Sequence, residues 1–574
     1  MSQHSATHYL LEAFCDVGIE YLFCNLGTDH VPIIEELARW KQEGRRGPEV
    51  ILCAHENLAM HMAMGYAMAT GRGQAVLVHV DVGTANAAMG MHNLLRSRVP
   101  CLLFAGKAPF TGRGELPGSR DTFVNFLQEP FDQAGLVRPY AKWTYDLPSG
   151  MVAKSVVARA HIVMHSGAPG PVFLSAAREV LMAEQPESEV LAHAPPRQRA
   201  LAPAGLDDAS VSQLARMISA ARAPVLITAY AGRNPEALDA IDALSRLAGM
   251  RVYESNAIHV NIPRDSPCFS GFVAGAELAD ADLVLMVDVD VPWVPKYAKL
   301  NPQARFALID IDALKRDMPI WDFPVDVRLQ ADAASVLRRV AELLKKEADD
   351  GFRTAAATRL TALTRRRQML REQTAALAKN RGVKGQLSPA FVAAELNKVM
   401  APDDILVHET ITNVIPVMQQ IERTRPLTAF SNGGGGLGIG GVALGAKLAH
   451  PDRLVVHVSG DGSFVFSNPL AMMLAERRYG LPVFTVILDN GGWGAVKGAT
   501  LRALPDGCAR QMGDYHAVLG SGIHHEKLAE TVGGYGECVE DPDDLAPAIQ
   551  RCVHAVRSGS PAILVVRIER IDLV

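Results

Sequence analysis

The feature that most constrains the fold of this chain is an alternation of short apolar runs with longer helix-like stretches. Between Tyr9 and about Leu181 the apolar runs are YLFCNLG, EVILCAHE, QAVLVHV, CLLFAG and PVFLSA. Strands that alternate with helices pair in parallel, because each helix carries the chain back to the same end of the sheet. The pattern predicts an α/β domain built on a parallel sheet over residues 1–185.

The same alternation recurs in two further blocks. The expected strands are APVLITAY, MRVYES, DLVLMVDV and ARFALIDI within residues 200–345, and DILVHE, RLVVHVSGDG, PVFTVILDN and PAILVVRIE within residues 385–574. The Pro- and Ala-rich stretch 183–205 lacks periodicity and predicts a linker. The charged, Ala- and Leu-rich stretch 345–386 predicts an exposed helical connection. We therefore expect three consecutive α/β domains with parallel sheets.

Composition narrows the class of partner. The chain has 574 residues, 48% hydrophobic and 21% charged, and its net charge of -5 is accompanied by no basic tract, which argues against nucleic acid or an anionic membrane as partner. No apolar stretch approaches the roughly 20 residues of a membrane span, and the amino terminus lacks a secretion signal.

Eight cysteines without metal-binding spacing predict buried free thiols in a reducing compartment. We expect a soluble, cytoplasmic protein that acts on small molecules.

Two expected strands of the third domain end in glycine-rich polar turns, VSGDGSFVFS from Val458 and LDNGGWG from Leu488. Taken alone, a GDG triplet is more often a tight turn. In an α/β sheet, however, ligands bind outside the carboxyl ends of the strands. Asp461 offers a carboxylate between two glycines, and Asn490 offers a neutral oxygen, which suits a magnesium ion bridging a diphosphate. Upstream, the glycine run FSNGGGGLGIG is either a loose loop or a place where a ligand approaches the backbone closely.

In this order and spacing, these motifs resemble the diphosphate-binding signature of thiamine-diphosphate-dependent enzymes, the superfamily of acetolactate synthase, benzaldehyde lyase and pyruvate decarboxylase. The family usually has two asparagines where this chain has Asp489 and Asn490, so the resemblance implies Asn490 as the ligand and leaves the role of Asp489 open. Leu437 stands at the position of the apolar wedge beneath the cofactor, where Met is common. The resemblance implies Mg²⁺ ligands Asp461, Asn490 and Gly492, and further cofactor contacts at Gly435, Gly460, Gly462 and Ser463.

The amino-terminal block contains the glutamate that such an enzyme requires. Glu56 closes an expected strand and opens a helix, a placement that the helix dipole alone also favours, by about 0.3–1 kcal/mol. The resemblance implies that Glu56 is the cofactor-activating glutamate, hydrogen-bonded to the aminopyrimidine ring. The GTAN turn that follows adds Thr84 and Asn86 to the implied cofactor site.

Other matches concern the substrate and the ring. The segment LQEPFDQAGLVRPYAKW is similar to that of benzaldehyde lyase and implies a catalytic role for Gln128, although an exposed polar side chain is an equal alternative. The loop NLGTDHVP matches the family loop that usually contributes donors or a base near the substrate, which implies such a role for Thr28, Asp29 and His30. Glu409 and Thr410 match the loop that holds the aminopyrimidine, but Glu409 could instead form an exposed salt bridge. Trp493 has a counterpart in benzaldehyde lyase, and a core tryptophan is the alternative.

The resemblance implies a thiamine-diphosphate- and Mg²⁺-dependent lyase or carboligase that acts beside a carbonyl of a 2-oxo acid or 2-hydroxy ketone. A 2-oxo acid decarboxylase or a 2-hydroxyacyl-CoA lyase is the alternative. Simple decarboxylation ranks lower because the tandem histidine pair of that branch is absent from GKAPFTGRG. An inert cofactor-binding paralogue is a third reading, because Asp489, Glu409 and Leu437 depart from the family pattern.

The resemblance also bears on cofactors and assembly. We expect no FAD, because the flavin-contacting pattern is not evident around CFSGFVAGAEL in the middle block. The family builds each active site from the glutamate of one subunit and the diphosphate site of its neighbour. The resemblance therefore implies a homodimer or homotetramer.

Overall fold

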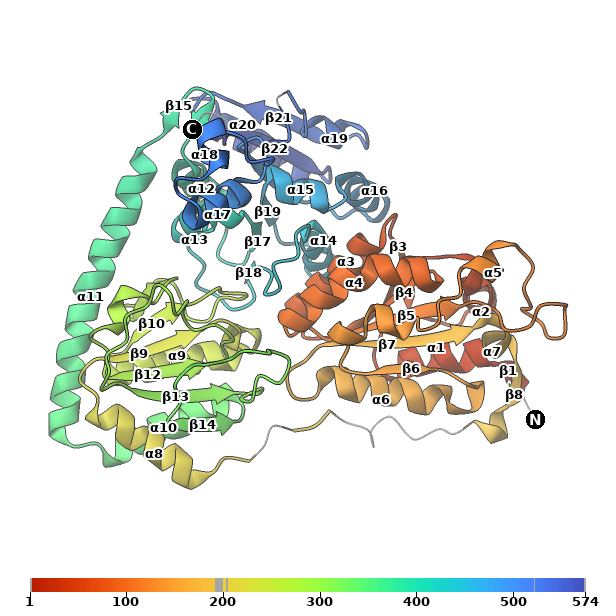
Figure 1. Ribbon diagram of the computed structural model, residues 1–574, viewed down its shortest axis with the longest axis horizontal. Helices are drawn as coiled ribbons and strands as arrows, with labels where there is room; N and C mark the ends of the chain where they lie inside the picture. The colour runs from red at the N-terminus through yellow and green to blue at the C-terminus, as the bar shows by residue number, and fades with distance from the viewer. Residues whose placement is uncertain (1–2, 191–199, 203–204, 521, 572–574) are drawn as a thin grey trace.

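The computed structural model describes residues 3–190, 200–202, 205–520 and 522–571, and it contains three α/β units (Figure 1). Each unit is built on a six-stranded sheet, and all strand pairs within these sheets are parallel. This confirms the predicted fold class. The predicted linker over 183–205 falls partly on residues 191–199 and 203–204, which lie outside the described residues, and the three domain boundaries remain predictions.

The first sheet has the strand order β3-β2-β4-β5-β7-β6. All five apolar runs expected in this block form strands, and β6 is an additional edge strand. The strands are β2 (Tyr21–Asn25), β3 (Glu49–Leu52), β4 (Gln74–Val78), β5 (Cys101–Lys107), β6 (Thr144–Asp146) and β7 (Pro171–Ala177). The main helices are α1 (Ala6–Asp16), α2 (Val31–Gln42), α3 (Glu56–Thr70), α4 (Val80–Arg96) and α6 (Ala153–His165).

The middle sheet has the order β11-β10-β9-β12-β13-β14. Its strands are β9 (Pro224–Thr228), β10 (Arg251–Glu254), β11 (Phe269–Gly271), β12 (Leu283–Val287), β13 (Arg305–Asp310) and β14 (Val327–Gln330), packed by α8 (Asp208–Ala220), α9 (Pro235–Ala248) and α10 (Ala333–Glu347). The predicted helical connection is confirmed as α11 (Asp350–Lys379), which runs along the edge of the molecule toward the third unit (Figure 1).

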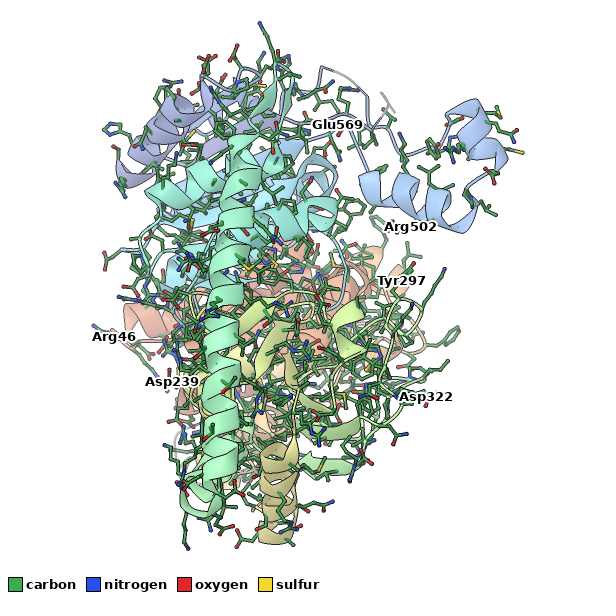
Figure 2. All side chains as sticks on the ribbon, turned by 90° about the vertical axis from the view of Figure 1, so that its left-hand side faces the viewer. Arg46, Asp239, Tyr297, Asp322, Arg502 and Glu569 are labelled. Carbon is green, nitrogen blue, oxygen red and sulfur yellow. The ribbon has the colours of Figure 1, made fainter. Side chains whose placement is uncertain are left out.

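The third sheet has the order β18-β17-β19-β20-β22-β21. Its strands are β17 (Ile405–Glu409), β18 (Ala429–Phe430), β19 (Val455–Gly460), β20 (Phe484–Asp489), β21 (Tyr535–Val539) and β22 (Ala562–Arg567). The helices are α12 (Pro389–Val399), α13 (Val414–Gln420), α14 (Gly440–Ala449), α15 (Asp461–Phe466), α16 (Pro469–Tyr479), α17 (Gly494–Ala503), α18 (Cys508–Met512), α19 (Lys527–Glu530) and α20 (Leu545–Arg557). In Figure 2 the helix that carries Arg502 projects from the body of the molecule.

Helices α3 and α14 join the first and third units at very close range. A Cβ added at Gly65 would lie 2.1 Å from the carbonyl oxygen of Val442, and one added at Gly445 would lie 2.0 Å from that of Met62. Only glycine permits such an approach of two helix backbones. The contact brings the start of α3, where Glu56 lies, against the third unit.

Two smaller expectations can be compared with the structure. Within the described residues, no helix is both long and apolar enough to span a bilayer. All eight cysteines are free, but the expectation that they are buried holds for only five, because Cys15 and Cys508 are exposed and Cys538 is half-buried.

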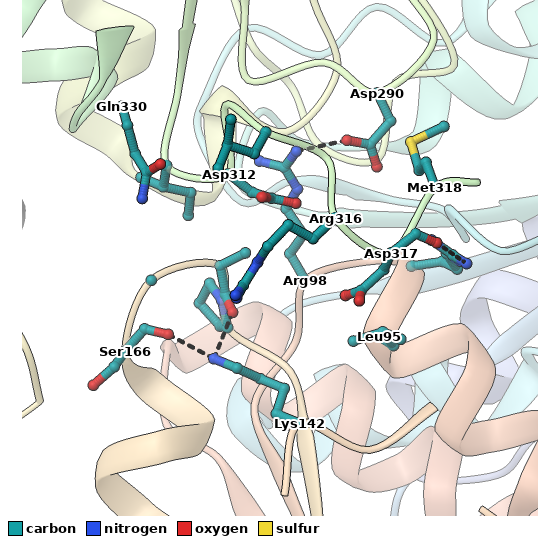
Figure 3. A pocket seen from close by; sticks show the side chains of 16 residues that line it. Leu95, Arg98, Lys142, Ser166, Asp290, Asp312, Arg316, Asp317, Met318 and Gln330 are labelled. Atoms are coloured by element: carbon teal, nitrogen blue, oxygen red, sulfur yellow. Dashed lines mark hydrogen bonds and ion pairs between the residues drawn. The ribbon is translucent and has the colours of Figure 1, made fainter. Parts of the chain in front are cut away.

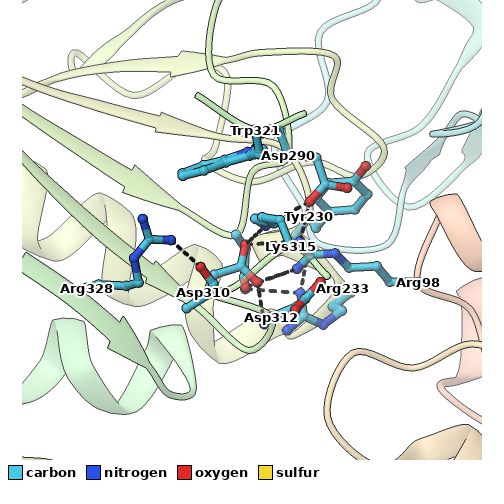
Figure 4. A network of polar contacts seen from close by, with 11 residues as sticks. Arg98, Tyr230, Arg233, Asp290, Asp310, Asp312, Lys315, Trp321 and Arg328 are labelled. Atoms are coloured by element: carbon cyan, nitrogen blue, oxygen red, sulfur yellow. Dashed lines mark hydrogen bonds and ion pairs between the residues drawn. The ribbon is translucent and has the colours of Figure 1, made fainter. Parts of the chain in front are cut away.

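An ionic network joins the first unit to the middle one (Figure 4). Arg98 follows α4 in a left-handed backbone conformation, and its guanidinium is buried. It contacts Asp310 at 2.9 Å, Asp290 at 2.7 Å and Asp288 at 3.4 Å. Lys315 adds a second buried cation, 2.8 Å from Asp290 and 2.5 Å from Asp310. The carboxyl edge of the middle sheet therefore depends on a cation that the first unit supplies.

A cavity of about 350 Å³ opens beside this network, between the first and middle units (Figure 3). Lys142 lines it and donates to the carbonyl oxygens of Ser166 at 2.5 Å and Ala168 at 2.7 Å. Burial lowers the pKa of Lys142 to about 8. Basic side chains of Arg98 and Arg316 line the cavity together with the carboxylate of Asp312. The expectation that the protein binds no flavin stays a prediction.

We predict that Arg98→Met lowers the thermal midpoint of unfolding, because it leaves buried carboxylates short of a cation, a change that costs about 3–5 kcal/mol in comparable buried pairs. Differential scanning calorimetry measures the effect. Arg338→Met is the control, because Arg338 pairs with Glu236 at the exposed surface and its loss should change the midpoint little. Equal midpoints for the two variants would contradict the structural role of Arg98.

Candidate active site

Two polar turns meet at the carboxyl edge of the third sheet. Strands β19 and β20 are adjacent and parallel, and Gly460 pairs with Leu488 near the ends of both. Asp461 follows β19 directly and Asn490 follows β20, so the two predicted magnesium ligands lie at the same edge. Both side chains are buried. The edge is the one at which ligands bind in α/β sheets.

The carboxylates of this edge repel one another. The pKa of Asp461 is raised to about 7, first by burial and second by the charge of Asp489, while hydrogen bonds from the backbone amides of Gly462 and Asn490 oppose the shift. Asp489 itself forms an ion pair with Arg567 and accepts a hydrogen bond from the backbone N–H of Gly491 at 2.9 Å. The role of Asp489, which the sequence left open, is therefore to pair with Arg567 and hold the turn.

The oxygen atoms at this edge suit a Mg²⁺ ion that is also bound by the phosphate groups of a ligand. Asp461 and Asn490 offer oxygen atoms, and Gly492 offers a backbone carbonyl at a φ of 153°. The described residues contain no group of three or more His, Cys, Asp or Glu side chains that could hold a metal. Magnesium takes one or two carboxylates and completes its octahedron with phosphate and water oxygens. A cation here also offsets the repulsion between the two aspartates.

The turn after β19 has room for a ligand on one side and is closed on the other. A Cβ at Gly460 would meet no atom within 4 Å, whereas one at Gly462 would lie 2.6 Å from the indole of Trp493. Trp493 also packs edge-on against Phe466, and its buried Nε1 has no hydrogen-bond partner among the described residues. Ser463 is buried in the same turn. An unpartnered buried donor beside an open glycine turn suits a polar ligand.

The glycine run forms a loop supported from below by Glu409. Gly435 and Gly438 have φ values of 74° and 97°, which favour glycine. The carboxylate of Glu409 accepts from the backbone N–H of Gly438 at 3.0 Å and of Ile439 at 3.2 Å. Burial raises the pKa of Glu409 to about 8 despite these donors. The alternative of an exposed salt bridge is wrong, because Glu409 is buried and bonded to backbone.

Two predicted residues complete this loop. Leu437 is half-buried between Gly435 and Gly438. Thr410 is buried, and its hydroxyl has no hydrogen-bond partner among the described residues. The glycine loop therefore carries an apolar side chain and has an unsatisfied hydroxyl near it. Such a pair could contact a ligand ring that has both apolar and polar edges.

Glu56 is held by two amides. It starts α3 and is 5% exposed. Its Oε1 accepts from Asn25 Nδ2 at 2.9 Å, and its Oε2 accepts from Asn86 Nδ2 at 3.1 Å. The structure thus joins the predicted pair Glu56 and Asn86, and adds Asn25, which the sequence analysis did not single out. Thr84 points elsewhere, because its hydroxyl bonds to the carbonyl of Val80 and accepts from Gln133.

His79 joins the predicted substrate residues in a way the sequence analysis missed. Its Nδ1 lies 2.5 Å from Asp29 Oδ1, and its Nε2 lies 3.0 Å from Gln128 Oε1. The hydrogen bond to Asp29 raises the pKa of His79 above its ordinary value. Both ring nitrogens face oxygen acceptors, which favours the doubly protonated ring. The sequence analysis missed His79 because it stands inside the apolar run QAVLVHV, although a lone histidine directly after a strand was the available signal.

His30 takes a different position from the one expected. It is fully buried, its Nδ1 accepts from the backbone N–H of Gly27 at 3.1 Å, and it lies 3.1 Å from Asp29. Its Nε2 has no hydrogen-bond partner among the described residues. His30 therefore lies beside Asp29, and His79 is the histidine that contacts Gln128.

Within one chain, the start of α3 in the first unit contacts the glycine loop of the third unit. Asn57, the residue after Glu56, donates through Nδ2 to the carbonyl oxygens of Gly438 and Phe466, each at 3.1 Å. The helix that begins at Glu56 is thereby tied to the glycine loop and to the end of α15. These elements carry the residues that the sequence analysis assigned to a cofactor.

Comparison with known proteins agrees with this geometry. Three family models match the chain: the N-terminal TPP binding domain of thiamine pyrophosphate enzymes at residues 4–136, their central domain at 211–340 and their C-terminal TPP binding domain at 412–566. Thiamine pyrophosphate is another name for thiamine diphosphate. The chain belongs to the thiamine-diphosphate-dependent enzymes.

Individual relatives are distant and their activities differ. The chain is 24% identical to the acetolactate synthase large subunit of Haemophilus influenzae, over 96% of this chain and 92% of that protein. It is 26% identical to the benzoylformate decarboxylase of Pseudomonas aeruginosa, over 86% and 87%. The fold also matches the structure of a thiamine diphosphate-dependent 4-hydroxybenzoylformate decarboxylase from Rhodococcus jostii, with a TM-score of 0.78, 22% identity and 99% of each chain covered.

We predict that Asp489→Asn lets Mg²⁺-supported binding of thiamine diphosphate persist to lower pH. Binding requires ionised Asp461, so it weakens as the pH falls below about 7. The substitution removes a negative neighbour and leaves Arg567 with its more distant carboxylate partner, Glu540 at 3.9 Å, and both changes lower the pKa of Asp461, by roughly one unit. Tryptophan fluorescence at a series of pH values measures the binding midpoint.

Asp350→Asn at the start of α11 is the control for this shift and should leave the midpoint unchanged. A midpoint that stays at the wild-type pH, or rises, in Asp489→Asn would show that Asp489 does not influence Asp461.

Proposed function

We propose that this protein is a thiamine-diphosphate- and Mg²⁺-dependent lyase or carboligase that makes or breaks the carbon–carbon bond beside the carbonyl of a 2-oxo acid or 2-hydroxy ketone. The observation that carries the proposal is the environment of Glu56, a buried carboxylate held by two neutral amides. Neutral donors leave its negative charge available for a hydrogen bond to a protonated ring nitrogen.

The proposed cofactor contacts follow from the chemistry of the residues. Asp461, Asn490 and the Gly492 carbonyl would hold Mg²⁺, and the backbone from Gly460 to Ser463 would face the diphosphate. Leu437, Gly435, Glu409, Thr410 and Trp493 would surround the rings. When bound, the cofactor supplies a nucleophilic carbon for a carbonyl group and accepts the electron pair of the bond that breaks.

The substrate side is assigned to the chain's own acids and bases. His79, whose protonated form the hydrogen bond to Asp29 favours, would donate a proton to a carbonyl oxygen as negative charge develops there. Gln128 orients His79 and presents its amide to the same oxygen. His30 acts through Asp29, which it contacts. Glu56 and Gln128 thus remain proposed catalytic residues and His79 is added to them, whereas His30 becomes a positioning residue beside Asp29.

A second candidate activity is decarboxylation of a 2-oxo acid. The sequence argument against it was the absence of a tandem histidine pair. The position of His79 between Asp29 and Gln128 weakens that argument, because it supplies a histidine to the same region from a different strand. Release of CO₂ without a second carbonyl substrate distinguishes this activity from carboligation.

A substrate screen tests the proposal directly. Purified protein is incubated with thiamine diphosphate and Mg²⁺ and offered 2-oxo acids, benzoin-type ketones and 2-hydroxyacyl-CoA thioesters, with products identified by mass spectrometry. Turnover of any class supports an enzyme of this family and selects its reaction. Cofactor binding without turnover on all three classes favours the inert paralogue, and a visible flavin absorbance band would overturn the cofactor assignment.

We predict that Glu56→Gln abolishes turnover, by at least about 100-fold in kcat, while the dissociation constant of thiamine diphosphate changes little. The amide keeps the shape and the contact with one asparagine but cannot share a proton with the ring. Steady-state kinetics and fluorescence titration measure the two quantities. Full activity in this variant would refute the role of Glu56.

We further propose that the protein assembles as a homodimer or homotetramer. Apolar side chains on α15 and α16 are half exposed in the single chain: Val465 at 45%, Phe466 at 48%, Leu470 at 52% and Leu474 at 48%. This face lies beside β3, since the backbone N–H of Leu52 donates to the Tyr479 hydroxyl at 2.6 Å. A second copy is the proposed cover, because the face borders the loops on which the proposed site depends.

We predict that Leu474→Glu shifts the protein toward smaller species in sedimentation velocity, because it places a charge in the proposed contact. Leu377→Glu on α11 is a matched control, since Leu377 is 54% exposed on a helix that we do not assign to an interface. A wild-type protein that sediments as a monomer at micromolar concentration would contradict the proposal.

A further inference from the structure

Leu437 is bracketed by two asparagines of the first unit. Gly436, on one side of it, is bound by Asn93 of α4, and Gly438, on the other side, is bound by Asn57 of α3. Helices α3 and α4 and the start of α14 gather at the junction of the two units (Figure 1). The glycine loop of the third unit therefore takes part of its shape from the first.

Asn93 contacts both polar groups of one residue. Its Nδ2 donates to the carbonyl oxygen of Gly436 at 2.9 Å, and its Oδ1 accepts from the backbone N–H of Gly436 at 3.2 Å. Asn93 is fully buried. A Cβ at Gly436 would lie 2.7 Å from Asn93 Oδ1, so the amide and the glycine fit only each other. A two-point contact of this kind fixes the orientation of a peptide group as well as its position.

His61 fixes the orientation of the Asn93 amide. Its Nδ1 lies 2.9 Å from the carbonyl oxygen of Asn57 and its Nε2 lies 2.9 Å from Asn93 Nδ2. Burial lowers the pKa of His61 to about 4, so the ring is neutral near pH 7. A neutral ring donates from Nδ1 to the carbonyl and accepts at Nε2 from Asn93. The hydrogen bonds run from α3 through His61 and Asn93 to Gly436.

The same helix also holds Glu56. Asn86 and Asn93 are seven residues apart on α4, which places them on one face, two turns from each other. Asn86 donates to Glu56, and Asn93 holds the loop that carries Leu437. Helix α4 thereby contacts both the carboxylate and the loop that carries Leu437 within one chain, and the inter-subunit arrangement that the resemblance implies would place these two groups in two different cofactor sites.

We propose that Asn93 is a positioning residue that fixes the peptide before Leu437, and hence the placement of Leu437 against the cofactor rings, an inference that rests on the proposed function. Asn93 touches neither substrate nor cofactor in this proposal. Its effect passes through Gly436. Removal of the amide frees the loop, so that cofactor binding has to order it.

The test is Asn93→Leu, which keeps the size of the side chain and removes both hydrogen bonds. Asn261→Leu is the matched control. Asn261 is also fully buried, accepts from the backbone N–H of Gly232 at 2.8 Å and donates to the carbonyl of His259 at 2.8 Å, but it lies in the middle unit. The two variants lose comparable contacts, so a general loss of stability appears in both.

Three quantities are measured for wild type and both variants. They are amide hydrogen exchange of peptides covering residues 433–440 without cofactor, the dissociation constant of thiamine diphosphate with Mg²⁺ from tryptophan fluorescence, and kcat and KM at saturating cofactor. Asn93→Leu should speed exchange in the loop and raise the dissociation constant, each about tenfold, as expected for the loss of one or two hydrogen bonds. It should also lower kcat with little change in KM.

The outcomes separate this inference from the proposed function. Unchanged exchange and unchanged cofactor affinity in Asn93→Leu, or equal changes in Asn261→Leu, would overturn the positioning role while the enzyme still turns over substrate. Wild-type protein that binds no thiamine diphosphate would overturn both the proposed function and the inference. If Asn93→Leu fails to fold, Asn93→Asp replaces it: the carboxylate keeps an acceptor for Gly436 N–H and loses the donor, and the same loop exchange is measured.

Discussion

The backbone contact between α3 and α14 is the constraint on which the rest of the structure depends. Gly65 and Gly445 let the two helices approach until side chains no longer separate them. The start of α3 then reaches the loops at the carboxyl edge of the third sheet, and Asn57 can bond to Gly438 and Phe466. A methyl group at either glycine would push the helices apart and separate Glu56 from the glycine loop.

The middle and third sheets differ in how the carboxylates at their carboxyl edges are neutralised. At the third sheet, Asp461 and Asp489 face each other with one arginine on the outer side, so the edge attracts a cation from solution. At the middle sheet the protein supplies its own cations, and Arg98 and Lys315 neutralise the carboxylates from within. The same type of sheet edge is thus the proposed metal site in one unit and is filled by cations of the chain in another. The two edges differ because neighbouring elements place the cationic side chains of Arg98 and Lys315 among the carboxylates of the middle sheet.

Much of the fold was predictable because it is local. Every apolar run that was predicted to be a strand forms one, and the composition of 345–386 predicted α11. The edge strands that were not predicted are β6, β11, β14, β18 and β21. Motif residues such as Asp461 and Asn490 were predictable because parallel strands end at one edge. His79, Asn25 and Asn93 were not, because each derives its meaning from a partner far along the chain. Asn93 binds a glycine 343 residues away, and nothing in its own neighbourhood marks it. The position of Glu409 was predictable, but its burial was not.

Helix α11 has a consequence for how the molecule can move. Its 30 residues span about 45 Å, and apolar side chains of its first half, such as Phe352 and Leu363, are buried against the middle unit. Its second half is held by Glu422 of the third unit, which pairs with Arg367 and Arg371. Because α11 is fixed to the middle unit at one end and to the third unit at the other, it restricts hinge bending between the middle and third units. Helix α17, which projects from the body of the molecule, lies outside this restriction (Figure 2).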